Sequence, residues 1–198
     1  TMERMGYEPG LISYTTEHKL VHKETHVARP KLIGYGIVMG IMLAAFAFIA
    51  VLIVVAFIDL DHRIIPDTIS LPGIPIFFIA AIAATDLTWR SSAIGILAGG
   101  GSLFAVAWGY QLATGREGMG GGDIKLLAMI GAFIGWQGIF FTLFAASAIG
   151  TLIGILVMVR SGKGMKLAIP FGPFLAMGAV LYLFFGDPIV HWYLGILR

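Results

Sequence analysis

Long apolar segments dominate the chain, and the first runs over residues 32–58 without a charged residue. It exceeds the roughly 20 residues that a helix needs to cross the hydrocarbon core of a bilayer. Of the 198 residues, 58% are hydrophobic and 12% are charged, whereas about a quarter of the residues in a soluble domain are charged. Backbone that crosses lipid must satisfy its own hydrogen bonds, so these segments predict an all-α integral membrane protein.

Further apolar segments follow, separated by short polar turns. Pro72 and Pro75 interrupt the second segment, so we expect a kink or a late helix start there. Residues 126–136 are too short to span alone and are expected to extend from Asp123 with a tilt or to be partly re-entrant. Gly99 to Gly101 are expected to allow close helix contact. The segments predict a bundle of about six transmembrane helices: 32–58, 69–84, 93–113, 126–136, 139–159 and 167–186.

Residues 1–31 form the long polar piece of the chain, and we predict a polar N-terminal tail ahead of a membrane domain over residues 32–198. His22 and His26 stand at helical spacing but do not fit the His-Glu-x-x-His zinc pattern, so a solvated tail is favoured over a metal site. The start of the chain also resembles the membrane-proximal segment of FixG-type cytochrome oxidase accessory proteins, over residues 1–45 at most. That resemblance suggests a borrowed or fused N-terminus and implies no function.

The distribution of charge bears on orientation. If Asp59, Asp123 and the basic loop at residues 160–166 share one side of the membrane, the short loops of that side hold most of the Lys and Arg. This favours a cytoplasmic location for the two acids. The basic residues of the tail would then lie outside, so the orientation of the tail stays open. The formal net charge of +2 gives no argument for nucleic acid binding.

A glycine-rich segment precedes the fourth apolar segment and ends in Asp123. Glycines let backbones approach closely and adopt dihedrals that other residues avoid. They are expected to shape a loop through which an extended peptide reaches Asp123; the alternative is that they only permit packing. Lys125 is expected either to anchor at the interface or to hold a substrate group. The candidate loop residues are Gly118, Gly120, Gly121 and Gly122.

Two carboxylates are the candidate catalytic groups. Asp59 ends the first apolar segment and Asp123 precedes the fourth, so alternating spans bring both to one face of the membrane. Each is costly to desolvate there, which makes it a functional candidate. Two such groups a few ångströms apart cannot both ionise easily and share a proton. One then acts as a base on water while the other, protonated, polarises a carbonyl, as in aspartic proteases.

Neighbouring acids have other expected roles. Asp123 itself has the alternative role of a helix N-cap. Asp61 is expected to point elsewhere than Asp59 on the helix end. Asp67 follows a proline at the next helix start, where capping is the expected role.

Other chemistries find no support in the sequence. The chain has zero cysteines, which excludes disulfides, thiolate zinc sites and a thiol nucleophile. His62 is the loop histidine near the site, and no hydroxyl stands in a nucleophile elbow. His62 and Arg63 are expected to meet lipid headgroups or water, and Pro170 and Pro173 to start a helix. We expect neither a metal nor a cofactor.

Three segments carry a specific resemblance to a known family: Asp59–Asp67, Gly118–Ala128 and Lys166–Leu175. Over about residues 50–190 the chain resembles the type IV prepilin peptidases. These are membrane aspartic proteases marked by the motif Gly-x-Gly-Asp, which here ends at Asp123.

The resemblance implies a specific reaction and location. The family cleaves the basic leader of type IV prepilins or type II secretion pseudopilins after a glycine, at the cytoplasmic side of the bacterial inner membrane. Its catalytic pair maps onto Asp59 and Asp123. Many members also N-methylate the new terminus and carry a cysteine-rich cytoplasmic loop for it. That loop is missing here, which puts methylation by this chain in doubt.

The alternative class is a non-enzymatic membrane protein, either a proton-coupled transporter that uses the same carboxylates as a relay or an accessory subunit. Transporters of this kind usually show internal repeats, and we find none in the sequence. They also tend to keep their carboxylates at mid-span, whereas these lie at segment ends. The peptidase interpretation is therefore favoured.

Overall fold

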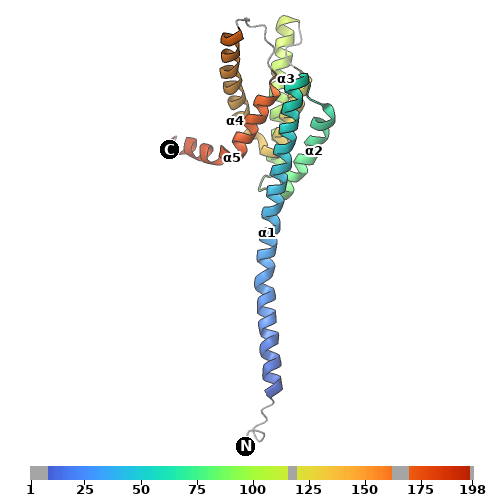
Figure 1. The fold of residues 1–198 in the computed structure, drawn as a ribbon, viewed down its shortest axis with the longest axis vertical. Helices are drawn as coiled ribbons and strands as arrows, with labels where there is room; N and C mark the ends of the chain where they lie inside the picture. Colours follow the sequence, from blue (N-terminus) through green and yellow to red (C-terminus); the bar gives the residue numbers. More distant parts are fainter. Residues whose placement is uncertain (1–8, 116–119, 162–169, 197–198) are drawn as a thin grey trace, which may run out of the picture. The chain divides into compact units, whose positions relative to one another are not determined.

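The structure is a computed structural model that describes residues 9–115, 120–161 and 170–196, with side chains for residues 35–115, 120–160, 170–186 and 188. All regular structure in these residues is helical, which confirms the predicted all-α fold class. The helices, labelled in Figure 1, are α1 (Pro9–His62), α2 (Asp67–Ala84), α3 (Trp89–Thr114), α4 (Gly121–Ser161) and α5 (Gly172–Ile196).

By its internal contacts the chain divides into two units, residues 1–42 and residues 43–198. Helix α1 begins at Pro9, so most of the predicted polar tail is helical. The side chains of His22 and His26 lie outside the described residues, as does the predicted basic loop from residue 162 onward. The expected division after residue 31 stays a prediction. The candidate site lies wholly in the second unit.

Helix α4 contains two of the predicted apolar segments, 126–136 and 139–159. Gly135 divides the helix with non-helical dihedrals, φ 74° and ψ 177°. Counting α4 as one helix, the described residues contain four helices long and apolar enough to cross a membrane. The count of about six crossings stays a prediction, and it depends on the course of the chain at Gly135.

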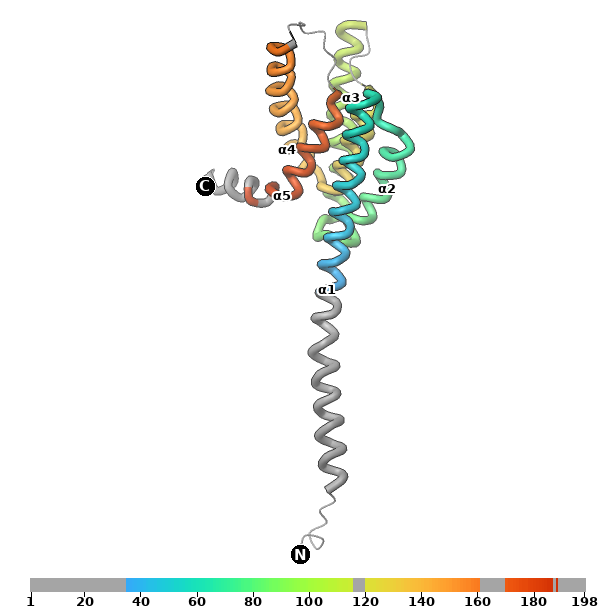
Figure 2. The backbone as a smooth tube through the Cα atoms, viewed as in Figure 1, coloured from blue at the N-terminus to red at the C-terminus, as the bar shows by residue number. Residues whose placement is uncertain are grey.

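The course of α4 is visible in Figure 2, where its colour changes from yellow to orange: the first half runs beside α3, and the second half returns toward the end at which α4 began. Side-chain neighbours agree with this path. The first half is antiparallel to α3, and the second half is antiparallel to α5, with Gly150 next to Phe174 and Gly178 next to Thr142. The end of α1 and the starts of α4 and α5 therefore lie at one end of the bundle.

A line of glycines brings α3 and α4 into backbone contact. A Cβ atom on Gly95 would lie 2.2 Å from the carbonyl oxygen of Gly131, and one on Gly99 would lie 2.4 Å from that of Leu127. Such contacts exclude any side chain and are typical of tightly packed membrane helices. The predicted close contact at residues 99–101 is confirmed for Gly99, whereas Gly101 faces open space.

An aromatic cluster joins α1 to α2 and α4. The ring of Phe48 lies 5.1 Å from Phe77 and 4.4 Å from Phe133, measured between centroids. Such ring pairs contribute about 0.5–1.5 kcal/mol beyond the area that they bury. Phe48 also begins a buried face of α1 that continues through Leu52 and Val55 at helical spacing. The next position on that face is Asp59, so the packing of α1 turns this acid toward the bundle.

Helix α2 begins at Asp67, ahead of both of its prolines. Of the two expectations, a kink or a late start, the late start is therefore wrong, and the kink stays a prediction. Pro66 occupies the N-cap position, and the hydroxyl of Ser70 donates to the Pro66 carbonyl oxygen at 3.2 Å. Prolines are tolerated in membrane helices because neighbouring helices and hydroxyl side chains satisfy the freed backbone groups.

Candidate active site

Asp59 lies in the last turn of α1, and its side chain is only 5% exposed. Its Oδ2 atom accepts a hydrogen bond of 3.0 Å from the backbone N–H of Gly172, the first residue of α5. A buried carboxylate requires such partners, because an unpaired charge away from water is strongly unfavourable. The structure thus links the end of α1 to the start of α5 through this acid.

Asp123 lies in the first turn of α4, and its backbone N–H donates to the carbonyl oxygen of Gly120 at 3.3 Å. Asp123 and Asp59 face a common cavity of about 270 Å³. Two acids from different helices thus line one cavity, and the predicted meeting of their carboxylates stays a prediction. The residues that line it are Asp59, Arg63, Ile64, Ile65, Gly120, Gly121, Gly122 and Asp123.

The glycines before Asp123 have different surroundings. Gly121 and Gly122 are the first residues of α4, so the predicted loop is shorter than expected. Side chains at Gly120 and Gly121 would enter open space, whereas a Cβ atom on Gly122 would lie 2.8 Å from the Cβ of Ile65. Gly118 lies outside the described residues. Whether these glycines shape a substrate path stays a prediction.

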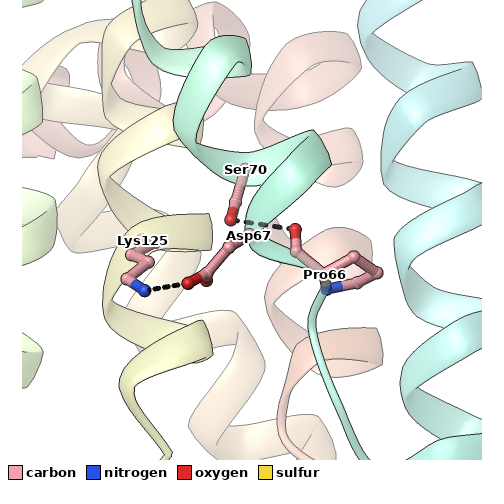
Figure 3. A network of polar contacts seen from close by, with 4 residues as sticks. All are labelled: Pro66, Asp67, Ser70 and Lys125. Carbon is pink, nitrogen blue, oxygen red and sulfur yellow. Dashed lines mark hydrogen bonds and ion pairs between the residues drawn. The ribbon is translucent and has the colours of Figure 1, made fainter.

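Lys125 and Asp67 form an ion pair that the sequence did not predict (Figure 3). The Lys125 ammonium on α4 lies 2.6 Å from the Asp67 carboxylate at the start of α2. Asp67 is therefore not the expected cap, a position taken by Pro66, which makes no side-chain cap bond. Both side chains are partly exposed, at 35% and 55%, and such pairs contribute about 1 kcal/mol or less. The pair links the first turn of α4 to the start of α2.

Arg63 and Gly172 are residues at the site that the sequence did not single out as site residues. Arg63 lines the cavity and is also exposed, so its expected contact with lipid headgroups or water stays a prediction. Its φ of 56° ends α1 and turns the chain back toward α2. Gly172 lies between the two prolines that were expected only to start a helix. Both residues belong to segments that resemble the family, Asp59–Asp67 and Lys166–Leu175. That resemblance does not indicate that either residue lies near the Asp59 side chain.

Two further expectations concern Asp61 and a bound metal ion. Asp61 is exposed and does not line the cavity, which agrees with the expectation that it points elsewhere than Asp59. Over the part of the chain with described side chains, no three His, Asp or Glu residues lie together so as to hold a metal ion. The expectation of a metal-free reaction stays a prediction.

Comparison with known proteins gives one family. A model of the type IV leader peptidase family matches residues 46–155, which include both Asp59 and Asp123. The prepilin leader peptidase/N-methyltransferase of Aeromonas hydrophila is 39% identical over 153 residues, 77% of this chain and 52% of that protein. The protein of the same name from Legionella pneumophila is 36% identical over 165 residues, 81% of this chain and 56% of that protein.

A third relative with that name, from Pseudomonas aeruginosa, is 37% identical over 143 residues, 72% of this chain and 49% of that protein. The chain thus spans about half the length of the curated relatives that it matches. No solved structure matches it significantly.

Proposed function

The chain belongs to the type IV leader peptidase family, and we propose that it removes the basic leader of type IV prepilins or type II secretion pseudopilins. The cut follows a glycine and takes place at the cytoplasmic side of a bacterial inner membrane. Asp59 and Asp123 are the catalytic residues. We do not extend to this chain the methyltransferase activity that the relatives' names include.

The observation that carries the proposal is the cavity shared by the two carboxylates. Like charges that face one small space disfavour joint ionisation, so the pair holds one proton between its members. A cavity of about 270 Å³ has room for a water molecule, which takes up about 30 Å³ in the liquid, and for part of an extended peptide backbone.

Hydrolysis then follows the aspartic protease scheme. The ionised carboxylate takes a proton from water, and the water oxygen bonds to the scissile carbonyl carbon. The protonated carboxyl donates its proton to the carbonyl oxygen. When the tetrahedral intermediate collapses, the C–N bond breaks and a proton passes to the leaving amine. Water and the two carboxyl groups account for every proton and bond in this scheme, so it needs neither a metal nor a covalent intermediate.

A groove beside the cavity suits the apolar part of the substrate. It measures about 570 Å³ and is lined by apolar side chains of α1 and α5 alone. Its lining includes Leu60 and Pro173, the residues directly after Asp59 and Gly172. We place the hydrophobic helix that follows the cleavage point in this groove, because its end then lies next to the acids. A helix hides its carbonyls in its own hydrogen bonds, so the cut falls where that helix has ended.

The test is a cleavage assay on purified protein in liposomes with a prepilin substrate. Asp59→Asn and Asp123→Asn should each abolish cleavage while the protein keeps its fold, because neither carboxylate can carry out the other's proton transfer. Asp61→Asn is the matched control from the same helix end and should keep most activity. Cleavage by Asp59→Asn with loss of activity in Asp61→Asn would show that Asp61 is the catalytic residue.

A further inference from the structure

We infer that the backbone N–H of Gly172 positions the Asp59 carboxylate and makes Asp59 the base of the pair, which leaves Asp123 as the acid. The inference rests on the proposed function, because it divides that reaction between the same two residues. It adds a positioning residue on α5, a helix that contributes no side chain to the cavity lining.

The contact itself is a cap between helices. Gly172 is the first residue of α5, and the first N–H groups of a helix have no partner within it. The Gly172 N–H donates to Oδ2 of Asp59 at 3.0 Å, in a buried setting. The positive end of the α5 dipole adds to this attraction for an ionised acceptor. Asp59 therefore meets a donor that favours its charged form.

Glycine is required at position 172 by lack of space. A Cβ atom there would lie 2.6 Å from Oδ2 of Asp59 and 3.2 Å from its Cγ. Any other side chain must displace the carboxylate or move the start of α5. The absence of a side chain is what lets the backbone N–H reach the acid.

The two carboxylates differ in the hydrogen bonds that they accept. Among the hydrogen bonds of the described residues, one is donated to the side chain of Asp59 and none to that of Asp123. Asp123 lies near the dipole of its own helix α4, but a direct hydrogen bond to a charged acceptor exceeds that effect several-fold. The other charged group lining the cavity is that of Arg63. Lys125 is paired with Asp67.

The test is the pH dependence of kcat/KM for cleavage by Gly172→Ala. Losing the N–H contact makes Asp59 harder to ionise, so the acidic limb should move to higher pH by about one unit. The basic limb should stay in place, and kcat should fall about 10- to 100-fold with little change in KM.

Gly178→Ala is the matched control. It is the same change in the same helix, and its Cβ would lie 2.7 Å from the carbonyl oxygen of Thr142, away from the cavity. It should leave both limbs in place. If Gly172→Ala moves the basic limb instead, Asp59 is the acid and the assignment is wrong. If it moves neither limb, the N–H contact has no part in the reaction.

A second variant removes the donor without adding atoms. Replacing Gly172 by glycolic acid turns the amide N–H into an ester oxygen, and the same shift of the acidic limb is expected. An unchanged profile in this variant would overturn the inference even if Gly172→Ala does not fold.

A wild-type chain that cleaves no prepilin would refute the proposed function but not the contact. Thermal unfolding tests the contact between the Gly172 N–H and Asp59 separately. Asp59→Ala should unfold at a lower temperature than Asp59→Asn, whose amide oxygen still accepts the N–H. Equal unfolding temperatures would refute the positioning role.

Discussion

Gly122 and Ile65 approach so closely that a Cβ atom on the glycine would lie 2.8 Å from the Cβ of the isoleucine. Ile65 belongs to the short connection between α1 and α2, and both residues line the acid cavity. This contact therefore sets the distance between the start of α4, which carries Asp123, and the end of α1, which carries Asp59.

The first prediction tests that contact by replacing Gly122 with alanine. Gly122→Ala should reduce cleavage about tenfold or more, because overpacking costs about 1–3 kcal/mol and here moves one acid relative to the other. Gly101→Ala on α3 is the control, since its side chain would enter open space away from the cavity lining, and it should retain near wild-type activity. The measurement is the initial rate of leader removal. Equal rates for the two variants would show that the contact does not set the geometry.

The second prediction concerns the distance between the acids. In the double variant Asp59→Cys with Asp123→Cys, the two thiols should join through a disulfide or a short thiol cross-linker, and zero native cysteines compete. A disulfide needs Cα atoms within about 7 Å, so the linker covers larger separations. Asp61→Cys with Asp123→Cys should not join, because Asp61 is exposed and outside the cavity lining. Mobility on a denaturing gel gives the answer, and failure of the first pair with every reagent argues against the dyad.

The third prediction places the substrate helix. Met177 lines the groove between α1 and α5 and is 41% exposed. In an Asp123→Asn background that retains substrate, Met177→Cys should cross-link to a cysteine in the apolar helix of a prepilin. Leu97→Cys on α3, where the native side chain is 75% exposed, should not. Preferential cross-linking to α3 would place the substrate on another face of the bundle.

The fourth prediction concerns stability. Gly99→Ala should lower the free energy of unfolding by about 1–3 kcal/mol, because its side chain would push against the backbone of α4. Gly101→Ala meets nothing within 4 Å and should be neutral or stabilising by up to about 1 kcal/mol, since alanine favours helix over glycine. Equilibrium unfolding in mixed micelles measures both. Similar losses in the two variants would contradict the packing described for α3.

The fifth prediction concerns the substrate residue before the cut. Replacing that glycine with valine should block cleavage, because valine adds a branched side chain next to the paired acids. Glycine there also weakens the helix by roughly 1 kcal/mol relative to alanine, which helps to expose the scissile carbonyl. Changing the length of the basic leader should have a much smaller effect. Efficient processing of the valine substrate would contradict a narrow site.

The sequence predicted the helices well because each apolar segment is long enough to leave few alternatives in lipid. It also singled out Asp59 and Asp123 as candidates. The structure places both on the lining of one cavity, while their catalytic role stays a prediction. Two features depend on tertiary contacts and had no local signal. One is the exact place of the reversal, at Gly135 inside one helix, where the sequence predicted only two separate segments, 126–136 and 139–159. The other is the bond from Gly172 to Asp59, which joins residues 113 positions apart.

Helix boundaries were less predictable, for a related reason. Apolar periodicity marks the part of a helix that meets lipid or core, but the ends are polar and depend on contacts. Helix α2 therefore begins at Asp67, ahead of its prolines, where the N-cap proline and the ion pair with Lys125 support it. In the same way, α4 begins with two glycines that resemble a loop.

The first half of α4, from Gly121 to the break at Gly135, rises only about 20 Å at 1.5 Å per residue. A typical hydrocarbon layer is about 30 Å thick, so this half cannot reach both water interfaces unless the bilayer thins around it. On the proposed function, cleavage should therefore depend on acyl chain length: thicker membranes should draw the start of α4, with Asp123, away from the headgroups, and thinner ones should bring it toward them.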